Sequence, residues 1–193
     1  NKFMKLIGRE TAHAKQGRPA RIVAKMNSLC DPGIIAALYE ASAAGVKIQL
    51  IVRGICCLKV GIEGVSENIE VRSIVGNFLE HSRIFWFENN GADEVYMGSA
   101  DWMPRNLDRR VEILFPVLDD DAKESAKHIL EVELSDNTKA HILKSDGNYE
   151  KIDKRGKVLV NSQMQFCEEA VAAVPKQDHV YRERVFVPAE PAE

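Results

Sequence analysis

The sequence predicts an α/β protein built on a mixed sheet flanked by helices. Residues 20–53 have the pattern of a strand, a helix and a second strand. The second strand, at 46–52, is almost continuously apolar, which is typical of a parallel strand covered on both faces. Further along, two apolar runs flank Asn90-Gly91, a pair that favours an antiparallel hairpin. Parallel and antiparallel strands in one chain indicate a mixed sheet.

The strand–helix–strand unit has clear boundaries. Its first strand is expected at 20–29, and Asp31 and Pro32 then suit a helix cap and a first helical residue. Apolar residues recur at helical spacing at Ile34, Ile35, Leu38 and Ala41. Gly45 ends this helix before the second strand. A crossover between parallel strands is almost always right-handed.

The remainder of the chain is predicted to form further strands and two helices. Strands are expected at 69–74, 82–88, 94–99, 110–117, 139–143 and 157–160. Three aspartates at 119–121 open a helix, since carboxylates are favoured at its positive end, and a second helix is expected at 161–173. We therefore divide the chain into a main domain at 1–135 and a small C-terminal β/α appendage at 136–193, packed on it. The tail after Pro175 is expected to be loose.

Composition excludes some classes of function. The chain has 193 residues, a net charge of −3 and no apolar run near the ~20 residues that span a bilayer. We therefore expect neither an integral membrane segment nor a nucleic-acid partner. The four cysteines form no C-x-x-C pair and fit reduced, mostly buried thiols of a cytoplasmic protein, free or peripheral to the membrane. The first residue is Asn1 rather than Met, so we expect a part of a longer protein.

Polar residues follow the two predicted parallel strands. Asn27 comes at the end of the first strand, and Arg53-Gly54 at the end of the second. In open α/β sheets, ligands gather beyond these carboxyl ends. A planar guanidinium there can bind a phosphate or carboxylate with two hydrogen bonds. The alternative is a surface arginine in a salt bridge.

His81 is the most informative single residue. Strand alternation places His81 and Arg83 on one face, and the hairpin places position 81 across from about 101–103, beside Ser99 and Asp101. Such a group can donate to phosphate oxygens, move a proton near neutral pH and hold the imidazole in one tautomer, the role expected of Asp101. The alternative is a structural histidine. Common nucleotide-binding glycine motifs are absent, and the other histidines lack a partner at metal-ligand spacing.

Four segments resemble the C-terminal catalytic domain of bacterial type-1 polyphosphate kinase. They are MNSLCDP (26–32), LIVRGICCL (50–58), FLEHSRIFWF (78–87) and YMGSADWMPRNLDRRVE (96–112). The resemblance covers about residues 1–135 and implies a phospholipase D-like mixed sheet. Compared with the phospholipase D motif H-x-K-x4-D, this chain has Arg83 for Lys and Glu88 for Asp, and only one copy of the motif.

The resemblance also implies an activity. The family reversibly transfers the terminal phosphate of ATP to polyphosphate through a phosphohistidine, which belongs to an upstream domain absent from this chain. This part alone is therefore expected to be inactive, with ATP or ADP, polyphosphate and the upstream domains as partners, in a homo-oligomer. Mg²⁺ is expected in the intact enzyme with its ligands upstream, so no metal ligand is assigned here.

The family's residues carry over to specific positions. His81 matches a second essential histidine that contacts the nucleotide phosphates. Arg53 matches a phosphate-binding arginine, and Arg110 another, although Arg109 stands beside it. The further predicted nucleotide or polyphosphate contacts are Asn27, Arg83 and Ser99. A phospholipase D-like phosphodiesterase and a non-catalytic assembly module are the alternatives.

Overall fold

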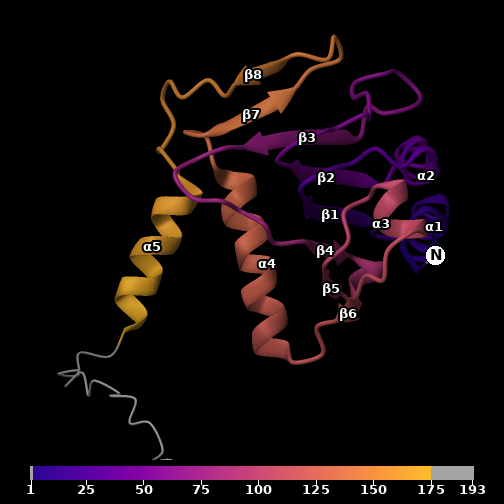
Figure 1. Ribbon diagram of the computed structural model, residues 1–193. Helices are drawn as coiled ribbons and strands as arrows, with labels where there is room; N and C mark the ends of the chain where they lie inside the picture. The colour runs from indigo at the N-terminus through magenta and orange to yellow at the C-terminus, as the bar shows by residue number, and fades with distance from the viewer. Residues whose placement is uncertain (1, 175–193) are drawn as a thin grey trace, which may run out of the picture.

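The computed structural model describes residues 2–174, and its eight strands form one sheet (Figure 1). The strands are β1 (Arg21–Met26), β2 (Lys47–Val52), β3 (Ile69–Ile74), β4 (Ile84–Phe87), β5 (Glu94–Gly98), β6 (Leu114–Pro116), β7 (Ala140–Leu143) and β8 (Tyr149–Lys151). They lie in the order β6-β5-β4-β1-β2-β3-β7-β8. Strand β2 pairs in parallel with β1 and β3, and all other neighbours are antiparallel. The predicted α/β class with a mixed sheet is confirmed.

Helices cover both faces of the sheet (Figure 1). They are α1 (Lys2–Lys15), α2 (Pro32–Ala43), α3 (Pro104–Asp108), α4 (Asp120–Ser135) and α5 (Ser162–Ala173). Alternation along β1 divides its apolar side chains between two cores: Ile22 and Ala24 pack with α1 and α2, and Val23 packs with α4. The helix α2 begins as predicted, with the Asp31 side chain accepting a hydrogen bond from the Ile34 amide at 2.8 Å.

Two helices were not predicted. In α1, Phe3, Leu6 and Ile7 form a buried stripe at helical spacing, a pattern that the prediction did not use. The five-residue helix α3 is too short to give a periodic signal.

The predicted hairpin is confirmed at β4 and β5. Ile84 pairs with Met97 and Phe87 with Glu94, so the connection is centred between Asn90 and Gly91. A 3₁₀ turn at Asn89–Gly91 closes it, with positive φ at all three residues. Asn and Gly are the residue types that adopt this conformation most readily.

The C-terminal strands differ from the prediction. Asp146 and Gly147 turn the chain as expected, with Gly147 at φ 88°, but the return strand β8 follows at once and not at 157–160. In the 157–160 segment, the backbone of Val160 forms hydrogen bonds with Asn137 and not with a neighbouring strand. Because β7 pairs with β3, the predicted appendage extends the main sheet. The domain boundary at 135 stays a prediction, and the tail after Pro175 lies outside the described residues.

Two further expectations can be compared with the structure. Within residues 2–174, no helix is both long and apolar enough to cross a bilayer. The four cysteines are free, as expected, but none is fully buried and Cys57 is exposed. The expectation of mostly buried thiols is therefore wrong.

Candidate functional site

His81 lies in a loop rather than in a strand. The prediction started a strand at residue 82, but β4 starts at Ile84, so His81 belongs to the 75–83 loop between β3 and β4. Extending the pairing of Ile84 with Met97 by three residues on each strand brings position 81 opposite Ala100. The expected range of 101–103 is therefore wrong by one residue, because the turn is centred nearer to Asn90 than expected. The side chain of His81 is exposed.

A pocket of about 500 Å³ opens beside His81. It is lined by His81, Arg83, Ser99, Asp101, Arg105, Asn106, Arg110 and Glu112. Five of these residues were predicted from the sequence, and three were not: Arg105, Asn106 and Glu112. The lining residues come from the ends of the hairpin, from α3 and from the segment before β6, and all of their side chains are polar.

Asp101 anchors one wall of this pocket. It is buried and accepts hydrogen bonds from Nε and Nη2 of Arg83, at 3.1 and 3.0 Å. It also accepts from the Asn27 backbone amide at 2.8 Å and from the Asn27 side chain at 3.3 Å. Desolvation by burial raises the pKa of Asp101, but the hydrogen bonds from Arg83 and Asn27 outweigh it, so the net pKa is lowered. Asp101 is therefore a carboxylate at neutral pH.

Asp101 thus holds Arg83 and Asn27, whereas the sequence prediction had it orient the imidazole. Arg83 in turn donates from Nη1 to the backbone carbonyl of His81 at 2.8 Å. Within the part of the chain that the structure describes, no hydrogen bond is formed by the His81 ring. Both ring nitrogens are therefore available to a ligand.

Glu112 anchors the opposite wall. Its carboxylate accepts hydrogen bonds from Ser99 Oγ and from Nδ2 of Asn106. These two bonds lower the pKa of Glu112. The Ser99 oxygen also accepts from the Ile113 amide at 3.1 Å. Ser99 therefore positions Glu112, besides its predicted role as a phosphate contact.

Gly98 makes this arrangement possible. A Cβ atom at position 98 would lie 2.3 Å from the carbonyl oxygen of Ile113, which is backbone and has little room to move. Only glycine allows the segment before β6 to approach β5 this closely. The Ser99 amide then donates to the same Ile113 carbonyl at 3.1 Å. The close approach of the Ile113 backbone thus accounts for a glycine at position 98, followed by Ser99.

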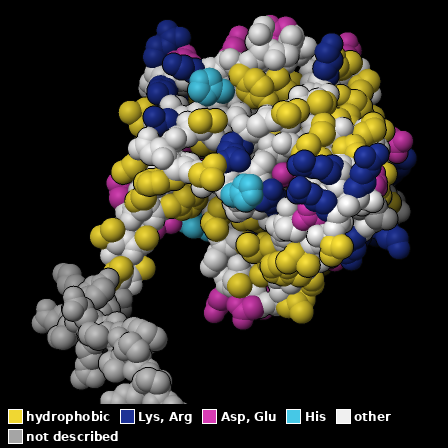
Figure 2. Space-filling model, in the orientation of Figure 1, with side chains coloured by type: hydrophobic (Ala, Val, Ile, Leu, Met, Phe, Trp, Pro, Cys, Tyr) yellow, Lys and Arg dark blue, Asp and Glu magenta, His cyan; other side chains and the backbone are white. Residues whose placement is uncertain are grey.

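Two arginines of the pocket form no hydrogen bond or ion pair with any described residue, although the charge of Arg110 helps to lower the pKa of Glu112. Arg105 and Arg110 are exposed, and neither side chain forms a hydrogen bond or ion pair within residues 2–174. Arg109 does not line the pocket, so Arg110 is the one of the adjacent pair that faces it. Figure 2 shows Lys and Arg side chains gathered close to a histidine on this face of the molecule. Guanidinium groups in this state can bind an anion without first breaking a salt bridge.

Neither Arg53 nor Asn27 lines the pocket, but Asn27 adjoins it through its two hydrogen bonds to Asp101. Their strand ends are joined: the Arg53 amide donates to the Met26 carbonyl at 3.2 Å, and the Gly54 amide to the Asn27 carbonyl at 2.8 Å. A Cβ at position 54 would lie 2.9 Å from that Asn27 oxygen, which accounts for the glycine. The guanidinium of Arg53 is partly exposed and forms no hydrogen bond with any described residue. The carboxyl ends of β1 and β2 therefore lie side by side as predicted, and Arg53 directly follows β2.

The described residues that line the pocket do not fit a divalent metal ion. No group of three or more His, Cys, Asp or Glu side chains within residues 2–174 is arranged to hold one. The two carboxylates that line the pocket, Asp101 and Glu112, already accept several hydrogen bonds each.

Fold and pocket together define an α/β domain with a polar pocket in which three arginines face two carboxylates. The family described as "Polyphosphate kinase C-terminal domain 2" matches residues 1–163. The chain belongs to this family, and the predicted resemblance is confirmed.

Known relatives agree with this membership. The polyphosphate kinase of Lactiplantibacillus plantarum is 55% identical over 170 residues, which are 88% of this chain and 24% of the relative. That of Pseudomonas aeruginosa is 52% identical over 173 residues, which are 89% of this chain and 25% of the relative. The crystal structure of polyphosphate kinase from Porphyromonas gingivalis gives a TM-score of 0.85 at 42% identity, covering 89% of this chain and 26% of that one. This chain thus spans about a quarter of the length of these relatives.

Proposed function

We propose that this chain is the C-terminal part of a polyphosphate kinase that reversibly transfers the terminal phosphate of ATP to polyphosphate. The proposal is supported by the family membership and by the names of the relatives. The observation that carries it is the pocket itself, in which the unpaired guanidinium groups of Arg105 and Arg110 lie with the exposed imidazole of His81.

The pocket's side chains suit phosphoryl transfer. Catalysis of this reaction depends mainly on positioning and on stabilising negative charge that spreads over phosphate oxygens. Arg110 and Arg105 would bind phosphates of the nucleotide or of the polyphosphate chain, with Arg53 after the end of β2 as a further contact. The imidazole of His81 can accept a proton from, or donate one to, a phosphate oxygen.

The fixed residues would orient these groups. Arg83 is held by Asp101 and presents its remaining donor capacity to the pocket, while Asn27 ties Asp101 to the end of β1. Ser99 and Asn106 hold Glu112. These residues give the site a rigid frame, because each carboxylate is bonded from two segments.

The complete reaction needs parts that we assign to the rest of the protein. The phosphorylated histidine and the ligands of Mg²⁺ would lie upstream, so this part alone would be inactive. ATP or ADP would be the nucleotide substrate. We also propose a homo-oligomer in the cytoplasm, either free or peripheral to the membrane.

A binding experiment tests this proposal on the chain as it stands. Calorimetric titrations of wild type and of the double variant Arg53→Ala/His81→Ala would use long-chain polyphosphate and ADP. We expect wild type to bind polyphosphate and the double variant to lose binding. Equal binding by the two proteins would contradict the assigned site. Hydrolysis of a generic phosphodiester, abolished by His81→Ala, would instead favour the phospholipase D-like alternative.

A further inference from the structure

The 75–83 loop, which carries His81, is held from the side opposite the pocket. Its apolar residues Val75, Phe78 and Leu79 are exposed, so burial of its own side chains contributes little to its position. Glu80, directly before His81, points into the protein and lies 3.1 Å from Nζ of Lys25. The Lys25 side chain comes from the middle of the sheet and is only 3% exposed.

A second carboxyl group joins this ion pair. Glu133 of α4, with a side chain 2% exposed, lies 3.5 Å from Nζ of Lys25. Burial, and then the hydrogen bond with Glu80, raise the pKa of Glu133 to about 9. Burial also raises the pKa of Glu80, but the hydrogen bond from Glu133 and the charge of Lys25 outweigh it, so the net pKa is lowered. The buried cluster therefore holds one ammonium, one carboxylate and one carboxylic acid, with no net charge.

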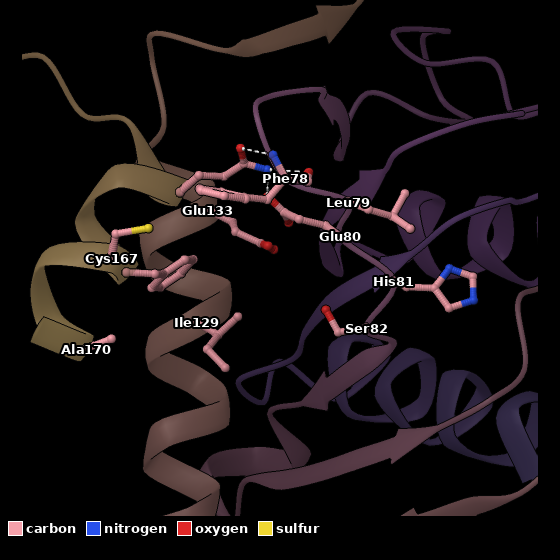
Figure 3. A pocket seen from close by; sticks show the side chains of 11 residues that line it. Phe78, Leu79, Glu80, His81, Ser82, Ile129, Glu133, Cys167 and Ala170 are labelled. Carbon is pink, nitrogen blue, oxygen red and sulfur yellow. Dashed lines mark hydrogen bonds between the residues drawn. The ribbon is translucent and has the colours of Figure 1, made fainter. Parts of the chain in front are cut away.

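Helix α5 closes the cluster from outside. Nε2 of Gln163 donates to Glu80 at 2.7 Å and to the Phe78 carbonyl at 2.9 Å, and the Phe78 amide donates back to Oε1 at 3.0 Å. Figure 3 shows a second pocket, of about 550 Å³, which Glu80, Glu133 and Gln163 line on one side and His81 on the other. The carboxyl groups of Glu80 and Glu133 are turned toward each other, while the imidazole of His81 points away from them. Adjacent residues of one loop thus face a buried ion pair and the open pocket.

We propose that Glu80 is a positioning residue for His81: its ion pair with Lys25 fixes the loop so that the imidazole faces the phosphate-binding pocket. The imidazole makes no hydrogen bond of its own within the described residues, so its position depends on its neighbours in the chain. Arg83 holds the carbonyl of His81, and the ion pair with Lys25 holds Glu80, the residue before it. This inference rests on the proposed function and extends it to a residue that does not line the pocket.

The cluster supplies a matched pair of variants. Both Glu80→Gln and Glu133→Gln remove one carboxyl group and leave the other to balance the charge of Lys25. Glu133→Gln keeps the ion pair on the loop, because glutamine replaces a neutral acid and can still donate to Glu80. Glu80→Gln moves the ion pair to α4 and releases the loop. The two variants therefore differ in which segment is tied to Lys25.

The experiment measures kcat and KM for ATP formation by the full-length protein, together with amide hydrogen exchange in the 75–83 loop. We expect Glu80→Gln to lower kcat about tenfold or more, with KM changed less than about threefold, because displacement of a catalytic group affects the transition state more than substrate binding. Its loop amides should exchange faster. Glu133→Gln should lower kcat by less than about twofold and leave loop exchange unchanged.

Equal effects of the two variants on kcat and on loop exchange would overturn the proposal. Gln163→Ala gives an independent test if Glu80→Gln does not fold, since it removes the outer hydrogen bonds without changing a charge. We expect this variant to speed loop exchange and to lower kcat several-fold; unchanged values of both would also contradict the proposal. Absence of turnover in wild type would defeat the proposed function, while the exchange measurement would still decide whether Glu80 fixes the loop.

Discussion

Two groups of charges lie on opposite sides of the loop that carries His81, and they differ in how their charges are balanced. In the buried cluster, the ammonium of Lys25 is balanced by Glu80, and Glu133 and Gln163 complete the hydrogen bonds. In the pocket, Arg105 and Arg110 form no hydrogen bond or ion pair within residues 2–174, and only the charge of Arg110 acts on a neighbouring carboxylate, that of Glu112. The difference separates a charged side chain that holds the fold together, such as Lys25, from one that can bind a ligand. A side chain with no ion pair inside the protein is available to a ligand.

The two groups should respond differently to substitution. Breaking a buried ion pair leaves an uncompensated charge and costs about 3–5 kcal/mol of stability. An exposed arginine without a partner contributes little to stability, typically within ~0.5 kcal/mol. Variants of Arg105 and Arg110 should therefore change binding or turnover at nearly constant stability, whereas variants of the cluster should act through the position of the loop.

The largest effect is expected for His81→Ala. Loss of a general acid or base typically lowers the rate by about 10²–10⁴-fold. We expect this variant of the full-length protein to form almost no ATP from polyphosphate and ADP, with an unchanged melting temperature because the side chain is exposed. Turnover would be followed by luciferase detection of ATP. Normal turnover would remove His81 from the chemistry.

Arg53→Lys tests the predicted phosphate contact after β2. The charge is kept, but an ammonium cannot form the two parallel hydrogen bonds of a guanidinium. Loss of one charge-assisted hydrogen bond corresponds to about a tenfold or greater rise in KM or fall in kcat. Steady-state kinetics of the full-length protein would measure it. Kinetics like those of wild type would exclude Arg53 from the site.

Salt provides a test that needs no variant. If polyphosphate binds mainly to the unpaired arginines, its affinity should fall steeply as ionic strength rises, since exposed charges are screened. Titrations of the chain at increasing salt concentration would measure the slope. An affinity independent of salt would argue against an ionic site and would favour a different mode of binding.

The smallest effect concerns the pH dependence of stability. Glu133 keeps its proton in the folded state up to a pKa of about 9, whereas its ordinary value is 4.5. Its contribution to stability is fully present below the ordinary pKa and is lost as pH rises through the raised one, because unfolding then releases a proton. Between about pH 6 and about pH 8, the melting temperature of wild type should therefore fall relative to that of Glu133→Gln. A constant difference between the two proteins would contradict a protonated Glu133.

Much of the pocket could be predicted from the sequence. Alternation and the hairpin signal brought together His81, Arg83, Ser99 and Asp101, and the family resemblance added Arg110. Glu112 was missed because it depends on the close approach of Ile113 to Gly98, which no periodic pattern reveals. Asn106 was missed with α3. Its signal, a proline at the first helical position, is present at Pro104 but was not used.

The buried cluster was missed for a different reason. Lys25, Glu80 and Glu133 come from a strand, a loop and a helix that are far apart in the sequence, and only the packing of α4 on the sheet brings them together. One signal was available. Lys25 interrupts the apolar run from Ile22 to Met26 in β1, and a lysine buried in a sheet almost always has a charged partner.

The adjacent arginines at 109 and 110 test the central claim most directly. Only Arg110 lines the pocket beside His81, so the two alanine variants remove the same charge at neighbouring positions. Polyphosphate affinity would be measured by titration of the chain and both variants at one salt concentration. We predict that Arg110→Ala weakens binding about tenfold, and Arg109→Ala by less than about twofold. Equal losses would contradict a defined phosphate site and indicate attraction by surface charge alone.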